Sequence, residues 1–290
     1  MRAFDEQTAK DLEFDAIRTL LLHHCQNPSA IARAHALHPM DRQKQWQKEL
    51  EQAKEMLEIK REGNGFPAVG CEEIGADNER LAVRDSVLDE AGFHRLKTAS
   101  LTVNDVIAAL EERESSSPRL VHLASSVHHT LEIIESIDAV FDAKGQVRSN
   151  ASAKLIHIRE EMVRLRRAIN RQFLKDLKRF KERGWLADTN EGFINNRRVL
   201  AVNSTHKRKV SGTALGQSKN GSITFIEPAA NVSMNFEMEM LLDDERKEIL
   251  RILRALTAQT RKHLPLFRAY HVLLVELDWI RAKMQLAVEM

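Results

Sequence analysis

The chain has 290 residues, and its 44 Lys and Arg nearly balance its 42 Asp and Glu, for a formal net charge of +2. With 43% hydrophobic and 30% charged residues, it is predicted to be a soluble globular protein of about two domains. Aromatic residues make up only 5%, which argues against a platform that binds single-stranded nucleic acid by stacking on its bases.

Amphipathic patterns predict helices through the first half of the chain. They cover residues 6–26, 30–37, 41–61, 78–93, 100–114 and 120–141. Asn27-Pro28 marks one restart, because Asn caps a helix well and Pro fits its first turn. The helix over 100–114 is expected to begin after a cap at Ser100 or Thr102.

The second half of the chain is predicted to contain two long helices. The first follows a cap at Ser149-Asn150, runs over 152–180 and spans about 43 Å at 1.5 Å per residue. Its apolar residues are spaced by three and four, as in a seam that packs on one long partner helix: Leu155, Ile158, Met162, Leu165, Ile169 and Phe173. The second runs over 231–264, and after Pro265 a further helix covers 266–290.

Between these helices, Phe193 to Pro228 does not follow a helical pattern. Val199–Val202 and Ile223–Phe225 are β-branched or aliphatic runs, and Asn220-Gly221 suits a tight hairpin turn. We therefore expect two or three strands joined by basic loops.

Positive charge is concentrated in and before this stretch. Its cations are Arg197, Arg198, Lys207, Arg208, Lys209 and Lys219, and Glu227 is its sole acid. Residues 154–183 add eleven Lys and Arg against four Asp and Glu. Two interpretations stay open: a solvated surface, which is the common fate of Lys and Arg, or a surface that contacts phosphates.

Motifs for catalysis or metal binding are weak. Gly216–Ser222 has the glycine spacing of a phosphate-binding loop, but Ser222 stands where that loop needs lysine. The histidines at His23-His24 and His128-His129 are adjacent and so point to different sides of a helix, which favours helix-face roles over a metal site. Cys25 and Cys71 have no metal-ligand spacing and imply no disulfide framework. We expect no catalytic residues, metal or cofactor in this chain.

The N-terminus lacks the apolar core of a signal peptide, and no run approaches the length of a membrane span. We therefore expect a cytoplasmic protein without a membrane partner.

The basic stretch resembles the segment before the second lever helix in the MutS family, in its bacterial anti-recombination branch. The matching residues are Asn195–Val202, Lys207–Val210, Gly212, Gln217-Ser218, Gly221 and Thr224–Pro228. Leu12–Asp15 and Val147–Ser152 resemble further family segments, as do Glu245, Ile249 and Ile252–Arg254 in the return helix. Arg198, Ala201, Gly216 and Asn220 depart from the family pattern.

This resemblance implies a mainly α fold: a multi-helical core, two long antiparallel lever helices and a small inserted β-sheet as a clamp-like tip. The expected divisions are a helical core over 1–145, the first lever helix over 146–184, the β element over 185–230, and the returning lever with more core over 231–290. Family members carry an ATPase domain after the second lever helix, so ATP and Mg²⁺ are implied only for that domain. Two interpretations stay open: the domain follows Met290 in a longer protein, or this is a short member of the family that has lost it.

The resemblance also implies a homodimer that grips double-stranded or branched DNA in mismatch repair or control of recombination. Matching positions make Arg197, Arg198, Lys207, Arg208, Lys209 and Lys219 the first candidates for phosphate contacts. The second candidates are the lever cations Arg166, Arg167, Arg171, Lys175 and Lys178. The alternative is a helical dimerisation or interaction module that binds ribosomal or other structured RNA, or a protein partner.

Overall fold

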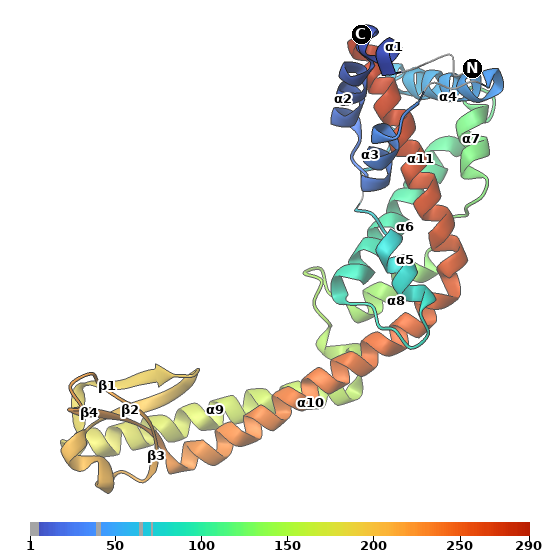
Figure 1. Cartoon of the computed structure of the whole chain (residues 1–290). Helices are drawn as coiled ribbons and strands as arrows, with labels where there is room; N and C mark the ends of the chain where they lie inside the picture. The colour runs from blue at the N-terminus through green and yellow to red at the C-terminus, as the bar shows by residue number, and fades with distance from the viewer. Residues whose placement is uncertain (1–5, 39–41, 64–65, 71) are drawn as a thin grey trace. The chain divides into compact units, whose positions relative to one another are not determined.

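A computed structural model describes residues 6–38, 42–63, 66–70 and 72–290, with the side chain of Glu6 left aside. In this part of the chain the fold is mainly α with one small antiparallel sheet, which confirms the expected fold class (Figure 1). It divides into two compact units, residues 1–146 with 253–290 and residues 147–252. None of the described helices is both long and apolar enough to cross a membrane.

The first unit is entirely helical in its regular elements. Its helices are α1 (Glu6–Asp11), α2 (Phe14–His24), α3 (Pro28–His35), α4 (Gln43–Arg61), α5 (Gly75–Ala82), α6 (Glu90–Glu111), α7 (Pro118–Ala124), α8 (Glu132–Val140) and α11 (Leu264–Glu289). Helix α11 contacts α2, α3, α4, α5 and α6, so it forms the centre of this unit. Trp279 of α11, for example, packs with Leu21, Ala30 and Ala34.

Several predicted helix boundaries in this unit are wrong, and local contacts explain them. Residues 6–26 form two helices, since Glu13 adopts a left-handed backbone with φ 50°. The predicted helix over 78–93 is confirmed only at its two ends, because α5 ends at Ala82 and a loop leads to α6. The predicted helix over 100–114 is the second half of α6, whose N-cap is Asp89; its carboxylate accepts a bond from Gly92 N at 2.8 Å. The predicted helix over 120–141 is broken between Ala124 and Glu132, where the side chain of Asn104 makes two hydrogen bonds of 2.8 and 3.1 Å with the backbone of Thr130.

Two further expectations concern single residues. The restart at Asn27-Pro28 is confirmed, because Asn27 Oδ1 accepts a bond from Ser29 N at 2.9 Å where α3 begins. The start of a helix at Asp41 and the state of Cys71 lie outside the described residues.

Cys25 is a buried free thiol whose pKa is raised to about 11, first by burial and then by the Asp278 carboxylate.

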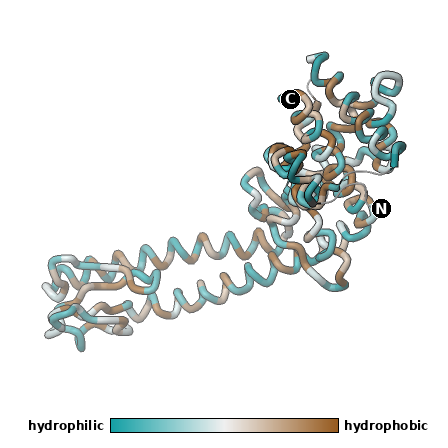
Figure 2. The backbone as a smooth tube through the Cα atoms, turned by 45° about the horizontal axis from the view of Figure 1, so that its top comes forward, coloured by the Kyte–Doolittle hydropathy of each residue, from teal (hydrophilic) through white to brown (hydrophobic). Residues whose placement is uncertain are grey.

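The second unit is built on two long helices, α9 (Ala153–Glu182) and α10 (Ala229–Thr260), which lie side by side (Figures 1 and 2). Residues of α10 up to Ile252 belong to this unit. We call α9 and this part of α10 the arm. Leu155, Ile158, Met162 and Phe173 are buried along α9, as the seam predicted, whereas Leu165 and Ile169 are half-buried.

The cap of α9 lies later than expected. Ser149–Ala151 forms a 3₁₀ turn, and Ser152 caps the helix by accepting a bond from Leu155 N at 3.0 Å. Ser152 also donates to Glu248 of α10 at 2.7 Å, and about two helical turns further along α9 Arg159 pairs with Glu245 at 2.7 Å. This end of the arm is thus fixed by charged hydrogen bonds between the two helices.

At the other end, α9 and α10 are joined by a four-stranded antiparallel sheet of order β1-β2-β4-β3. The strands are β1 (Leu186–Ile194), β2 (Arg197–Asn203), β3 (Gly212–Gln217) and β4 (Ile223–Pro228). The expected strand runs lie in β2 and β4, and β1 and β3 were not predicted. Leu200, Val202 and Ile226 pack on Phe173 and Phe180 of α9, so the sheet shares one core with the arm. We call it the tip sheet.

The hydrogen bonds of Glu248 predict how the stability of this unit depends on pH. Bonds from Arg251 and Ser152 hold the pKa of this buried carboxyl at about 2, against an ordinary value of 4.5. A carboxyl whose pKa is lower in the folded state than in the unfolded state stabilises the folded state at pH values above the unfolded pKa. This stabilisation is lost as the pH falls from about 4.5 to about 2.

We therefore expect Glu248→Gln to unfold more easily than the parent chain near pH 6, and the difference to shrink towards pH 2. Thermal unfolding of both proteins, followed by circular dichroism from pH 2 to 6, measures this difference. A difference that does not change with pH would contradict the assigned role of the carboxylate.

Candidate nucleic-acid interface

A cluster of exposed cations lies in the connection between β2 and β3 of the tip sheet. Lys207, Arg208 and Lys209 belong to the 3₁₀ turn over Ser204–Lys209, directly after β2, and all three side chains are exposed. Among the described residues, no acidic side chain pairs with any of them. Three adjacent unpaired cations can contact phosphates without first breaking an internal ion pair.

The turn that carries these cations is fixed by backbone contacts. Ser204 N donates to Ser222 O at 2.9 Å, and Ser204 Oγ donates to Gly221 O at 2.6 Å. Both partners belong to the turn between β3 and β4, where Gly221 has φ 67°. The cations therefore lie on a well-anchored frame, and their side chains are exposed to solvent.

Lys219 lies in the same β3–β4 turn. Its neighbour Asn220 organises this turn, because Asn220 Oδ1 accepts bonds from Ser218 Oγ at 2.7 Å and Ser222 Oγ at 2.8 Å. The connection from β2 to β3 ends at Gly212, which pairs with Pro228 at the far end of β4, but its 3₁₀ turn begins at the end of the sheet where Lys219 lies, because Ser204 binds the β3–β4 turn. The expected hairpin at Asn220-Gly221 is thus confirmed, and four of the six predicted tip cations lie in the two connections on either side of β3.

A small aromatic cluster supports this end of the sheet. The Trp185 ring stacks on Phe180 of α9 with centroids 5.7 Å apart, and the His206 ring lies 6.2 Å from it. Lys209 Nζ and the Arg183 guanidinium lie 5.7 and 5.0 Å from the Trp185 ring centroid. The ring thereby positions two cations at the surface. Neither Arg183 nor Trp185 was predicted from the sequence to belong to the site, although both follow the end of the most basic helix.

Arg197 and Arg198 have a different environment. Arg197 bridges Glu227 at 3.0 Å and Glu239 of α10 at 2.5 Å. Hydrogen bonds to Glu239 first and Glu227 second raise the pKa of Arg197 above its ordinary value. These bonds tie β2 to β4 and to the arm, so the guanidinium already has carboxylate partners.

Arg198 is held in the same manner on the other helix. The Nε and Nη2 atoms of its guanidinium donate to the two carboxylate oxygens of Glu191 at 2.8 and 3.0 Å, and Nη1 donates to Asn170 Oδ1 at 2.5 Å. The guanidinium also lies 4.5 Å from the ring centroid of Phe173. Phosphate contacts by Arg197 and Arg198 stay predictions, and the geometry gives both residues a clear role in fixing the tip sheet to the arm.

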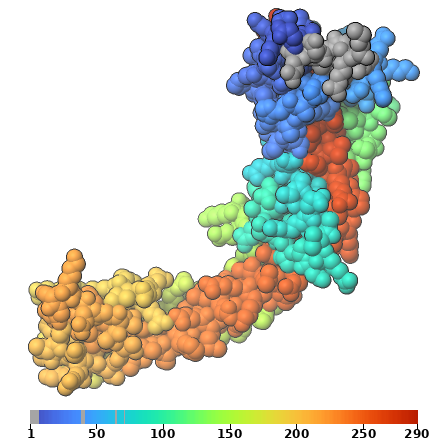
Figure 3. Space-filling view, in the orientation of Figure 1, coloured from blue at the N-terminus to red at the C-terminus, as the bar shows by residue number. Residues whose placement is uncertain are grey.

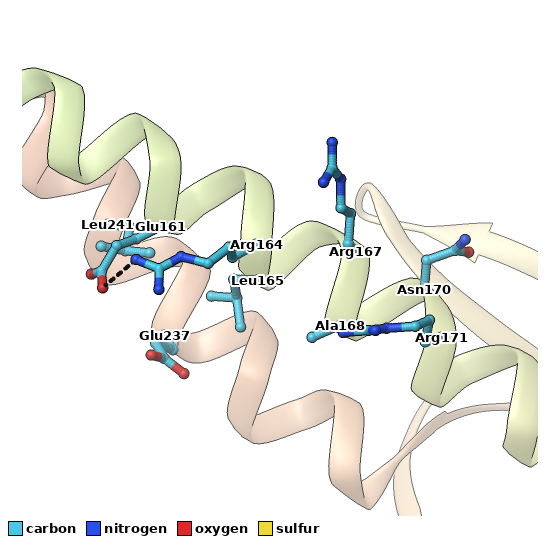
Figure 4. Close-up of a pocket in the computed structure, with 9 residues that line it drawn as sticks. All are labelled: Glu161, Arg164, Leu165, Arg167, Ala168, Asn170, Arg171, Glu237 and Leu241. Carbon is cyan, nitrogen blue, oxygen red and sulfur yellow. Dashed lines mark hydrogen bonds and ion pairs between the residues drawn. The ribbon is translucent and has the colours of Figure 1, made fainter.

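The second group of candidates lies along α9. Arg166, Arg167, Arg171, Lys175 and Lys178 are all exposed, and only Lys178 has an ion-pair partner among the described residues, Glu182 at 4.0 Å. A groove of about 690 Å³ runs between α9 and α10 in this region. Arg164, Arg167 and Arg171 line it from α9, and Glu237 and Leu241 line it from α10 (Figure 4).

Figure 4 shows that these side chains point in different directions. Arg164 turns along α9 to Glu161, with which it pairs at 3.3 Å, whereas Arg167 points away from α10. Arg164 was not selected from the sequence, because charge counting alone does not show which cation borders a groove.

The remaining motifs do not form a site. Gly216–Ser222 covers the end of β3 and the β3–β4 turn, so no helix follows it as a phosphate-binding loop requires. His24 Nε2 lies 3.1 Å from Glu289, and over the described ranges no cluster of three His, Cys, Asp or Glu residues could hold a metal ion.

Fold and site together define a mainly α protein whose two-helix arm ends in a small basic sheet. No family model matches the chain. It is, however, 30% identical over 281 residues to Endonuclease MutS2 of Streptococcus equi subsp. equi strain 4047, covering 96% of this chain. It is 27% identical to the MutS2 of Streptococcus agalactiae strain A909 and 26% identical to that of Alkaliphilus oremlandii, which cover 94% and 99% of this chain.

These similarities extend over nearly the whole chain and confirm the resemblance seen in its motifs: the chain is related to the MutS family. It spans about a third of the length of the relatives, 36% in the first and third and 35% in the second.

The contacts of Arg198 lead to a prediction about the stability of the tip sheet. Arg198→Lys keeps the charge but loses the fork to Glu191 and the flat contact with Phe173, and it should destabilise the second unit by about 1–3 kcal/mol. Lys207→Arg, an exchange between the same residue types at an exposed position, should change stability by less than about 0.5 kcal/mol. Denaturant unfolding followed by circular dichroism tests both, and equal effects of the two exchanges would contradict the structural role.

Proposed function

We propose that the tip sheet and arm bind double-stranded or branched DNA through its phosphate backbone, without reading sequence. The single observation that supports this most is a set of four exposed cations, Lys207, Arg208, Lys209 and Lys219, in the two connections that follow β2 and β3, without acidic partners in the described structure. Cations of this kind release condensed counterions from DNA when they bind, and this release drives sequence-independent binding.

The relatives support nucleic acid as the first choice of partner, because their name, Endonuclease MutS2, describes enzymes that act on nucleic acid. We propose that this chain contributes binding rather than catalysis, as part of a MutS-like protein in mismatch repair or control of recombination. The cations of α9 would extend the contact along the arm. ATP-driven switching, the homodimer and the structured RNA partner stay predictions from the resemblance.

The test is a charge reversal at the tip, Lys207→Glu with Arg208→Glu and Lys209→Glu. We expect at least a tenfold loss of affinity for duplex DNA at about 0.1 M salt. The slope of log K against log salt should flatten by about 2 to 3, because each lost phosphate contact removes about 0.9 from it. Fluorescence anisotropy with a labelled duplex measures both quantities.

The matched control reverses three exposed cations of the first unit, Lys10, Lys44 and Lys48, and therefore changes the net charge by the same amount. If both triple variants weaken binding equally, net charge rather than the tip explains the affinity. Unchanged binding in the tip variant would refute the proposed interface.

A further inference from the structure

An apolar groove of about 340 Å³ lies between α6 and α7 in the first unit. We call it the α6–α7 groove. Its apolar lining comes from both helices and from the loop after α7, and consists of Ile107, Leu110, Val121, Ala124 and Val127. Leu110 and Ala124 are buried, and the other three are half-buried, so the groove still offers apolar surface to a ligand. Figure 3 shows α7, in green, at the surface of the first unit.

An acidic recess of about 380 Å³ adjoins this groove. The recess is lined by Glu111, Glu112, Glu114 and Ser115. The first and the third of these glutamates also border the α6–α7 groove. All three glutamates are exposed, and none has an ion-pair partner among the described residues. The arginines closest in sequence are engaged elsewhere, because Arg113 pairs with Glu62 and Arg119 pairs with Glu51 at 2.8 Å.

The acids of the recess stand at the end of a helix, where negative charge is unfavourable. Glu111 is the last residue of α6, Glu112 is its C-cap, and the last turn of the helix has no basic residue. The helix dipole places partial negative charge at this end, so cations stabilise it and carboxylates destabilise it. A cationic group bound in the acidic recess would relieve this repulsion.

Hydrogen bonds inside the unit fix the frame of the α6–α7 groove. The buried carboxylate of Glu55 on α4 accepts bonds from Arg119 N and Leu120 N at 3.0 and 2.9 Å, where α7 begins. In the connection between the two helices, Ser117 N donates to Arg113 O at 2.8 Å. The groove is thus preformed, and a ligand does not have to order these segments in order to bind.

We propose that the α6–α7 groove and the acidic recess together bind a basic segment of a partner protein, with an apolar side chain in the groove and a Lys or Arg in the recess. Burial in the groove supplies apolar stabilisation, and the three carboxylates with the end of α6 select positive charge. Nucleic acid does not fit this surface, because its phosphates would meet carboxylates without partners. The inference goes beyond the proposed function, which concerns the second unit.

The experiment measures the binding of a fluorescein-labelled peptide, Lys-Arg-Leu-Leu-Lys-Arg, to the whole chain by fluorescence anisotropy at about 0.05 M salt. We expect a Kd below about 1 mM that rises as salt screens the charges. Lys-Arg-Ser-Ser-Lys-Arg lacks the apolar side chains and Glu-Glu-Leu-Leu-Glu-Glu has the opposite charge, so both should bind at least about tenfold more weakly. Equal binding of the serine peptide, or no binding of the leucine peptide at about 1 mM, would overturn the proposal.

The variant Glu111→Lys with Glu114→Lys identifies the surface. It should lose at least about tenfold in affinity for the basic leucine peptide and gain affinity for the acidic one. The matched control is Glu79→Lys with Asp105→Lys, two exposed acids of the same unit that line neither the groove nor the recess. This control should bind the basic peptide as the wild type does. If both variants weaken binding equally, net charge explains the affinity and the proposal is wrong.

Thermal unfolding of the same variant separates lost binding from lost folding. Because cations are favourable at the end of a helix, Glu111→Lys with Glu114→Lys should raise the unfolding midpoint of the free chain by about 1–3 °C while it loses the basic peptide. A lower midpoint would contradict the unfavourable charge at this end of α6, on which the proposal depends. Self-association of the wild-type chain without peptide, if this variant abolished it, would make a second copy the occupant and would also refute the proposal.

Discussion

The carboxylate of Glu227 is fully buried where β4 leads into α10, and a charge in that position must be paired. Arg197 donates to one oxygen at 3.0 Å and Asn235 of α10 donates to the other at 2.6 Å. This requirement fixes β2, β4 and α10 together. It also divides the basic stretch into cations that hold the fold and cations that remain free, and the proposed interface depends on this division.

Arg198 completes the division on the side of α9. With both arginines engaged by carboxylates, the charge available to a ligand is concentrated at 207–209 and 219, in the 3₁₀ turn after β2 and in the β3–β4 turn, which meet at Ser204. The chain is related to the MutS family, but the proposed DNA contact rests on the exposed cations that have no carboxylate partner.

The sequence predicted the parts of this structure that depend on local pattern. The apolar spacing from Leu155 to Phe173 was sufficient for α9, and the β-branched run Val199–Val202 was sufficient for β2. Prediction from the sequence failed where contacts between residues far apart in the chain determine the local structure. The break before α8 depends on Asn104, 26 residues from Thr130, and the true cap of α9 depends on Glu248, 96 residues from Ser152. The engagement of Arg197 by Glu239 could not be predicted either, because it requires knowing that β2 lies beside α10.

The most direct test of the account is fluorescence anisotropy of the wild-type chain with a DNA duplex, a four-way DNA junction and an RNA hairpin across a salt series. If the four free tip cations each contact a phosphate of B-form DNA, the slope of log K against log salt should be about −3 to −4. We expect binding to the duplex or junction with such a slope, and weaker binding to the hairpin. Absence of binding to DNA, or a clear preference for the RNA hairpin, would contradict the central claim.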